Sequence, residues 1–218
     1  MIKDLKTGLK LMRYGAQYKS TLFSIVIITV AAVVFEVTSH GTNFLGAFYF
    51  LLLGMFPMQL IFSTDVSTMI QTTKMKRKIQ VTIPITVNVV LMSFCFLVIS
   101  VLRVIEIQKY PEDEAVMINS LILLGVSSMV FLAYMGAAFK HFVVSIICFF
   151  VVFMATYLPL YIWAYMAETP IVSLPVALLI CYGCILVGLA LQYLLLRAFY
   201  KHQMSKYAFG AQIRKLMQ

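Results

Sequence analysis

The residues that could support enzymatic chemistry are few and far apart in this sequence. Cys181 and Cys184 have the C-x-x-C spacing of redox and metal-binding pairs, but they lie in an apolar run. Because no charged neighbour is present to stabilise a thiolate, we interpret them as small packing residues. The three histidines, His40, His141 and His202, lie at the edges of different apolar runs, whereas a metal centre needs several converging ligands.

Motifs for ATP hydrolysis and for zinc-dependent proteolysis are absent. The sequence contains neither the phosphate-binding pattern G-x-x-x-x-G-K-S/T nor the pattern H-E-x-x-H. We therefore expect a chain that is not an enzyme on its own, with no catalytic residue, no metal site and no cofactor of its own.

The composition is that of a membrane protein. Hydrophobic residues make up 62% of the 218 residues and charged residues only 11%, against about 25% charged in a soluble domain. The mean hydropathy is +0.97. The formal net charge of +9 therefore reports orientation in a lipid bilayer, and we expect no nucleic-acid partner.

Six apolar runs are each close to the ~20 residues that cross the hydrocarbon core of a bilayer. They predict an all-α, polytopic membrane protein with spans at residues 21–38, 43–63, 81–102, 117–137, 142–166 and 173–196. The expected organisation is an interfacial segment at 1–19, a six-span domain at 20–196 that includes a cytoplasmic segment at 64–80, and a basic cytoplasmic tail at 197–218.

The first 19 residues combine an apolar stripe with a basic stripe. At helical spacing, Ile2, Leu5, Leu9 and Met12 share one face, and the basic face carries Lys3, Lys6, Lys10 and Arg13. This pattern favours an amphipathic helix lying in the membrane interface. The alternative is a positive flank that only orients the first span.

Charge predicts the topology. With both termini in the cytoplasm, 15 of the 17 Lys and Arg residues fall on the cytoplasmic side, and only Arg103 and Lys109 fall outside. The middle of every predicted span lacks Asp, Glu, Lys and Arg, which argues against a carrier driven by an ion gradient. Glu36, Arg103 and Glu106 lie near the outer ends, where they can reach water or each other.

Mild polarity and aromatic rings inside the spans are the candidates for a substrate pathway. Two interpretations stay open: hydrogen bonds between helices with an aromatic belt, or an amphipathic pathway for a partly apolar substrate. The candidate pathway residues are Asn88, Ser93, Asn119, Ser127, Tyr157 and Tyr161.

The segment at residues 65–84 is longer and more basic than a turn between two spans requires. It places Lys74, Lys76, Arg77 and Lys78 within five residues, and Pro84 follows in the first turn of the third span. Simple topological anchoring and a role in binding a cytoplasmic partner both explain the cluster.

The whole pattern resembles the permease subunit of a type-2 ATP-binding-cassette exporter. The shared features are an interfacial helix, six spans with both ends inside and a long excursion between spans two and three. The pattern KMKRKIQVTIPI at residues 74–85 is similar to the entry into span three in small bacterial members, including the permeases that export amphipathic peptides of the phenol-soluble modulin kind. The resemblance implies a bacterial cytoplasmic membrane protein. It also implies a coupling helix at about 65–73.

This resemblance implies partners as well as a mechanism. A separate ATPase subunit would bind ATP and Mg and would contact the coupling residues, and a second permease subunit, identical or paralogous, would complete the pathway. The implied coupling residues are Asp65, Val66, Met69, Ile70, Lys74, Lys76, Arg77 and Lys78. The expected function is export of a hydrophobic or amphipathic substrate, with peptide favoured, by alternating access. The alternative is a non-transporting immunity or accessory protein that binds a peptide or sensor partner.

Overall fold

The chain folds into an all-helical bundle with six helices long and apolar enough to cross a membrane. The computed structural model describes residues 2–15, 18–64, 75–167 and 169–208. This confirms the all-α polytopic fold. The elements are α1 (Ile2–Arg13), α2 (Tyr18–Thr38), α3 (Phe44–Leu52), α4 (Met55–Thr64), η1 (Lys78–Thr82), α6 (Ile83–Lys109), η2 (Pro111–Asp113), α7 (Glu114–Ala138), α8 (Phe142–Met166), α9 (Leu174–Phe199) and η3 (Lys206–Ala208).

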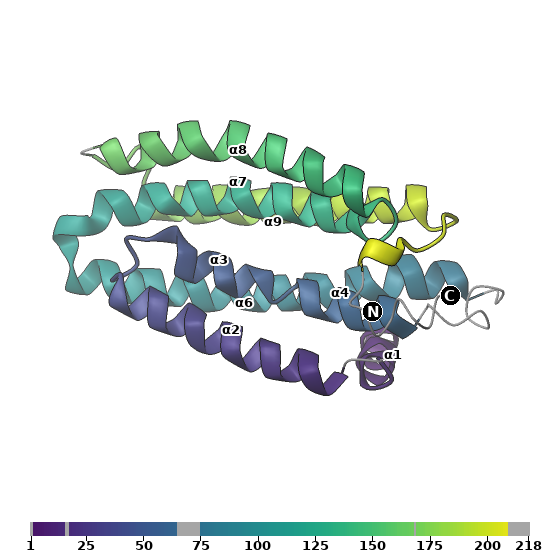
Figure 1. Cartoon of the computed structure of the whole chain (residues 1–218). Helices are drawn as coiled ribbons and strands as arrows, with labels where there is room; N and C mark the ends of the chain where they lie inside the picture. The colour runs from purple at the N-terminus through teal and green to yellow at the C-terminus, as the bar shows by residue number, and fades with distance from the viewer. Residues whose placement is uncertain (1, 16–17, 65–74, 168, 209–218) are drawn as a thin grey trace.

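The spans run side by side, and α1 lies across one end of them at a steep angle (Figure 1). This end also holds the start of α2, the end of α4, η1, the α7–α8 turn and η3, and we call it the basic end. Of the Lys and Arg residues that the structure describes, only Arg103 and Lys109 lie toward the opposite end, where α2 turns into α3.

Helix α7 is the central helix of one half of the bundle and packs tightly against α9. A Cβ on Gly125 of α7 would lie 2.8 Å from the Cα of Cys181, and one on Gly188 of α9 would lie 2.9 Å from the Cα of Met129. Small residues allow such close approach, which is a principal source of helix association in lipid. Cys181 and Cys184 border this contact, which agrees with their interpretation as packing residues.

The second span is broken into α3 and α4. The chain leaves the helix at Leu53 and Gly54, and Gly54 lies directly against the side chain of Met92, where a Cβ would collide. The hydropathy pattern predicts a single uninterrupted span at residues 43–63. A helix break inside an apolar run does not change the local hydropathy. The hydropathy pattern therefore did not indicate the break.

The third span is longer than predicted. Together, η1 and α6 form a span of 32 residues, about 48 Å at 1.5 Å per residue, against a hydrocarbon core of about 30 Å. The helix continues past the predicted end at residue 102 to Lys109, and η2 and α7 follow after Tyr110. The connection between the predicted third and fourth spans, residues 103–116, is therefore mostly helical.

Candidate functional site

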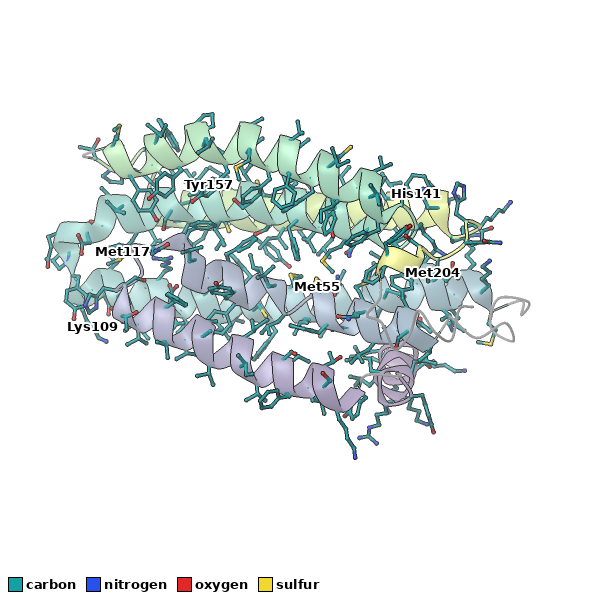
Figure 2. The ribbon with its side chains drawn as sticks, in the orientation of Figure 1. Met55, Lys109, Met117, His141, Tyr157 and Met204 are labelled. Atoms are coloured by element: carbon teal, nitrogen blue, oxygen red, sulfur yellow. The ribbon has the colours of Figure 1, made fainter. Side chains whose placement is uncertain are left out.

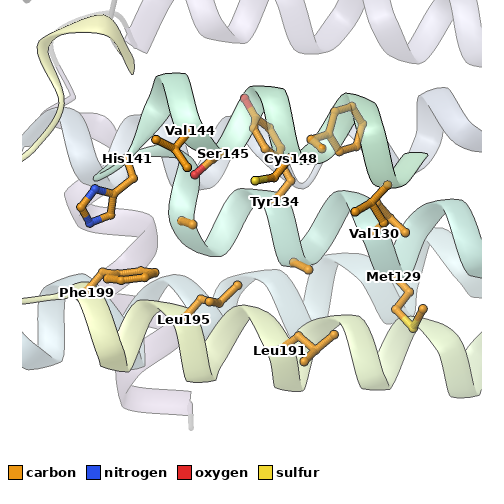
Figure 3. A pocket seen from close by; sticks show the side chains of 14 residues that line it. Met129, Val130, Tyr134, His141, Val144, Ser145, Cys148, Leu191, Leu195 and Phe199 are labelled. Atoms are coloured by element: carbon orange, nitrogen blue, oxygen red, sulfur yellow. The ribbon is translucent and has the colours of Figure 1, made fainter. Parts of the chain in front are cut away.

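An apolar groove of about 600 Å³ lies between α8 and α9, with α7 as its floor (Figure 3). Its α8 wall is exposed at the surface of the bundle: Val144 is 63% exposed and Val152 is 47% exposed. Across from this wall, Leu191, Leu195 and Phe199 repeat every four residues along α9. The lining comprises Met129, Val130, Ala133, Tyr134, Ala137, His141, Val144, Ser145, Cys148, Phe149, Val152, Leu191, Leu195 and Phe199.

The groove ends at the basic end beside a pair of histidines. The Nε2 of His141 lies 3.0 Å from the Nδ1 of His202, and the ring of Phe199 packs against both imidazoles. Next to them, the buried Lys140 donates to the Oε1 of Gln80 at 3.1 Å and to the carbonyl of His202 at 2.8 Å. The α7–α8 turn is thus joined to η1 and to the chain after α9.

From the groove, a row of aromatic rings continues along α8 toward the opposite end. We call this row the aromatic ladder; successive ring centroids lie 4.5–5.4 Å apart, within the range of favourable ring contacts. The ladder comprises Phe149, Phe153, Tyr157, Tyr161 and Tyr165, one residue every four. It spans about 24 Å, because an α-helix rises about 1.5 Å per residue.

The ladder packs α8 against α3. The rings of Phe44 and Tyr157 lie 5.2 Å apart, and those of Phe48 and Phe153 lie 6.4 Å apart. Figure 2 shows Tyr157 pointing into the bundle from α8. The first ladder ring, Phe149, also contacts Tyr134 of α7 at 4.9 Å, so the groove and the ladder share these two rings.

At the far end of the ladder, a buried ion pair joins α2 to α6. The Nε of Arg103 lies 3.3 Å from the Oε1 of Glu36, and both side chains are almost completely buried. A second guanidinium nitrogen, Nη2, donates to the carbonyl of Asn43 at 3.3 Å. Of the two possibilities expected for these residues, contact with water or with each other, Glu36 and Arg103 contact each other and are shielded from water.

Two glycines make room for this ion pair. Gly41, at a φ of +70°, lies against the Arg103 guanidinium, where a Cβ would be 2.5 Å from Nη1. Gly46 faces Glu36, where a Cβ would be 2.6 Å from Oε2. Any larger side chain at either position would push one charged group away from the other. Since both side chains are buried, no water lies within reach to solvate the separated charges.

Tyr165, the last ring of the ladder, fixes the adjoining turn. Its hydroxyl donates to the carbonyl of Thr42 at 2.8 Å and accepts from the backbone N–H of Phe44 at 3.2 Å. The α2–α3 turn is thus held by α6 through Arg103 and by α8 through Tyr165. We call Glu36, Arg103, Tyr165 and the turn at residues 39–44 the polar clamp.

The predicted pathway residues do not converge on one cavity. Asn88 is buried and donates to the Oε1 of Gln192 at 3.3 Å, and Ser93 lies 3.3 Å from the hydroxyl of Tyr182. Both are contacts between α6 and α9. These two residues therefore form hydrogen bonds between helices, and sequence reasoning did not identify Gln192 or Tyr182 as their partners.

The other four predicted pathway residues lie on two different helices, α7 and α8. Asn119 accepts from the backbone N–H of Ile171, which ties α7 to the α8–α9 connection, and Ser127 is buried within α7. Tyr157 and Tyr161 belong to the aromatic ladder. Their i,i+4 repeat with Phe149, Phe153 and Tyr165 is visible in the sequence and is the signal that could have identified the ladder.

The predicted coupling residues are only partly described. Asp65, Val66, Met69, Ile70 and Lys74 lie outside the residues that the structure describes. Lys76 and Arg77 precede η1, and Lys78 forms an ion pair of 2.7 Å with Asp4 of α1. The hydrogen bond from the Lys78 ammonium lowers the pKa of the Asp4 carboxyl below its ordinary value of 3.8.

Chemically, the groove can hold an apolar chain, because most of its lining is aliphatic and aromatic. In the described part of the chain, no three His, Cys, Asp or Glu residues come together as they would around a metal ion. The His141–His202 pair supplies two nitrogen ligands at most.

The fold places the chain in a broad class: a multi-pass, all-helical membrane protein. Comparisons with protein-family models, with curated proteins and with solved structures gave no match. The more specific assignment therefore depends on the physical arrangement alone.

Proposed function

We propose that this chain is the permease subunit of an ATP-driven exporter, of the type-2 ATP-binding-cassette class, in a bacterial cytoplasmic membrane. It exports a hydrophobic or amphipathic substrate, with a peptide favoured, and a separate subunit hydrolyses ATP with Mg. A second permease subunit, identical or paralogous, completes the pathway. Both chain termini and the basic end face the cytoplasm, in agreement with the positive-inside rule.

The observation that carries the proposal is the way the segment at residues 64–80 joins the bundle. Its last residues continue without interruption through η1 into α6. Within it, Lys78 pairs with Asp4 of α1, and Gln80 accepts from Lys140 at the α7–α8 turn. A force applied to this segment would therefore reach α1, α6 and the α7–α8 turn together.

Such a mechanical connection is what an ATP-driven permease requires. The permease itself binds no nucleotide, so closure of the ATPase subunits must be converted into movement of the spans. The amphipathic α1 lies across the bundle and contacts α4 and α6, so it supports the start of the third span from the side (Figure 1). The apolar groove and the aromatic ladder agree with an apolar or amphipathic cargo.

The proposal is tested by affinity purification of the chain from its native host in mild detergent, followed by mass spectrometry and an ATPase assay. We expect an ATPase with a phosphate-binding loop to co-purify. Variants Val66→Asp, Met69→Asp and Ile70→Asp should lose that subunit, because a charge would enter its apolar contact. Ile171→Asp, at the opposite end of the bundle, is the matched control and should retain it.

The alternative function makes the opposite prediction. An immunity or accessory protein would purify alone or with a partner that is not an ATPase. The three aspartate variants would then have no effect on ATP turnover in the preparation. Either result would overturn the exporter assignment and leave the membrane fold unchanged.

A further inference from the structure

We propose that the groove between α8 and α9 binds one acyl chain of an anionic phospholipid from the leaflet at the basic end. The phosphate group lies at the His141–His202 pair, and the chain lies between Val144 on α8 and Leu195 on α9 (Figure 3). This site is a property of the isolated chain and does not depend on the exporter function.

The location of the groove restricts its occupant to something dissolved in the bilayer. The groove opens on the surface of the bundle beside α8, in which only Ser145 and Ala164 are buried, and α8 is one of the six predicted spans. Away from the basic end, the lining is mostly aliphatic and aromatic, with Tyr134, Ser145 and Cys148 as its few polar or thiol side chains. A lipid chain can fill such a groove, whereas water would find few hydrogen-bond partners there.

The volume separates a lipid chain from a helical peptide. An α-helix with its side chains is about 10 Å across, so 12 residues occupy about 1,400 Å³. The groove offers about 600 Å³, less than half of that volume. A single extended acyl chain fits within this volume, whereas an amphipathic helix could place only one of its faces in the groove.

The mouth of the groove determines the headgroup. The hydrogen bond between His141 and His202 can form with either neutral ring as the donor. In both arrangements one ring N–H is directed away from the pair, so a phosphate oxygen can accept a hydrogen bond from it. The basic end carries most of the chain's Lys and Arg residues, and Lys140 lies directly beside the pair. Charge complementarity therefore favours an anionic headgroup over a zwitterionic one.

Native mass spectrometry of the purified, delipidated chain measures this binding directly. The chain is titrated with phosphatidylglycerol and with phosphatidylcholine that carry the same acyl chains. We expect one phosphatidylglycerol per chain, bound about fivefold more tightly than phosphatidylcholine, as expected for one favourable charge contact near a membrane surface.

Two groups of variants locate the site. Filling the groove with Ala137→Phe or with Val144→Trp should weaken phosphatidylglycerol binding about tenfold or more. Ala155→Phe adds the same bulk on an exposed part of α8 outside the groove, and it should leave binding unchanged. The double variant His141→Ala/His202→Ala should retain chain binding and lose the preference for phosphatidylglycerol.

Three results would overturn the assignment. Equal affinity of the wild-type chain for the two lipids would contradict the proposed preference for an anionic headgroup. Unchanged binding in both groove-filling variants would place the lipid elsewhere. If the wild-type chain is a dimer in the spectrum and Ala137→Phe dissociates it, the groove is a contact between two copies of the chain. Because no ATPase is present, failure here is distinguishable from failure of the exporter proposal.

Discussion

At the scale of single residues, the most consequential feature is a charge pair that the bilayer gives no means of solvating. Glu36 and Arg103 are both buried, and their closest side-chain atoms lie 3.3 Å apart. A buried ion pair is costly to form and much more costly to break, because the remaining charge is left in a medium of low dielectric constant. The pair is therefore a strong constraint on how α2 and α6 pack.

We predict that Arg103→Leu lowers the free energy of unfolding in detergent by about 3–5 kcal/mol, because it leaves the Glu36 carboxylate without its partner. The double variant Glu36→Leu/Arg103→Leu should lose much less, since no isolated charge remains. Lys109→Leu is the control: this lysine is 59% exposed, so its loss should cost less than about 1 kcal/mol. Equal losses in the single and double variants would contradict the paired assignment.

The Asp4–Lys78 pair is a second charge contact, placed at the surface of the basic end. Because folding lowers the pKa of Asp4, its contribution to stability is fully present above the ordinary pKa of 3.8. That contribution is lost as the pH falls through the lowered pKa, when Lys78 loses its anionic partner. The docking of α1 on η1 should therefore loosen only in acid.

We expect a spin label at Lys10→Cys, in a chain that also carries Cys148→Ser, to gain mobility as the pH falls below about 3.8. With Asp4→Asn added, the label should be equally mobile at every pH from 3 to 6, because no carboxylate titrates at the contact. A pH-dependent change of the same size in the Asn variant would assign the effect to another group.

At the scale of helices, the close approach of two backbones determines how α7 and α9 pack against each other. Gly188 faces the backbone of α7, whereas a Cβ on Gly183 would meet nothing within 4 Å. The two glycines lie on the same helix, five residues apart, and they differ only in which face of that helix they occupy. They therefore form a matched pair for measuring the packing.

We predict that Gly188→Ala lowers the free energy of unfolding by about 1–3 kcal/mol, because its Cβ would force α9 away from Met129. Gly183→Ala should be neutral or stabilising by up to about 1 kcal/mol, since alanine favours the helix and meets open space. Denaturant titration in mixed micelles compares the two. Similar losses of stability at both positions would show that the close packing of α7 against α9 is not the cause of the Gly188→Ala effect.

At the scale of the whole molecule, charge is distributed between the two ends of the bundle. The basic end gathers the amphipathic α1, the start of α6 and the α7–α8 turn, and the opposite end holds the polar clamp. Ion pairs and hydrogen bonds connect elements at both ends, and the apolar packing of the spans lies between them.

We predict that a membrane-impermeant maleimide labels Tyr110→Cys in intact cells and leaves Gln203→Cys unlabelled until the cells are lysed. The wild-type chain is the control, because its four cysteines all lie within the spans. The physical reason is the excess of Lys and Arg at the basic end, for which the positive-inside rule predicts the cytoplasmic side. Labelling of Gln203→Cys in intact cells would reverse the orientation, and the exporter proposal would fail with it.

The sequence by itself determined the number of spans, the approximate bounds of all but the third and the amphipathic character of α1. Partitioning into lipid is a sum over local residues, so hydropathy along the chain suffices. The predicted fifth span, at residues 142–166, agrees with α8 exactly as the structure has it. The polar residues Asn88 and Ser93 were also identified, although only as isolated positions.

Only the tertiary structure decided which faces of the spans meet. A helix that is apolar on all sides has no amphipathic pattern to fix its rotation about its own axis, so partners such as Gln192 for Asn88 are not readable locally. The break between α3 and α4, the burial of Glu36 against Arg103 and the groove between α8 and α9 all depend on that rotation. Contacts between helices, each specific to its neighbours, set these features.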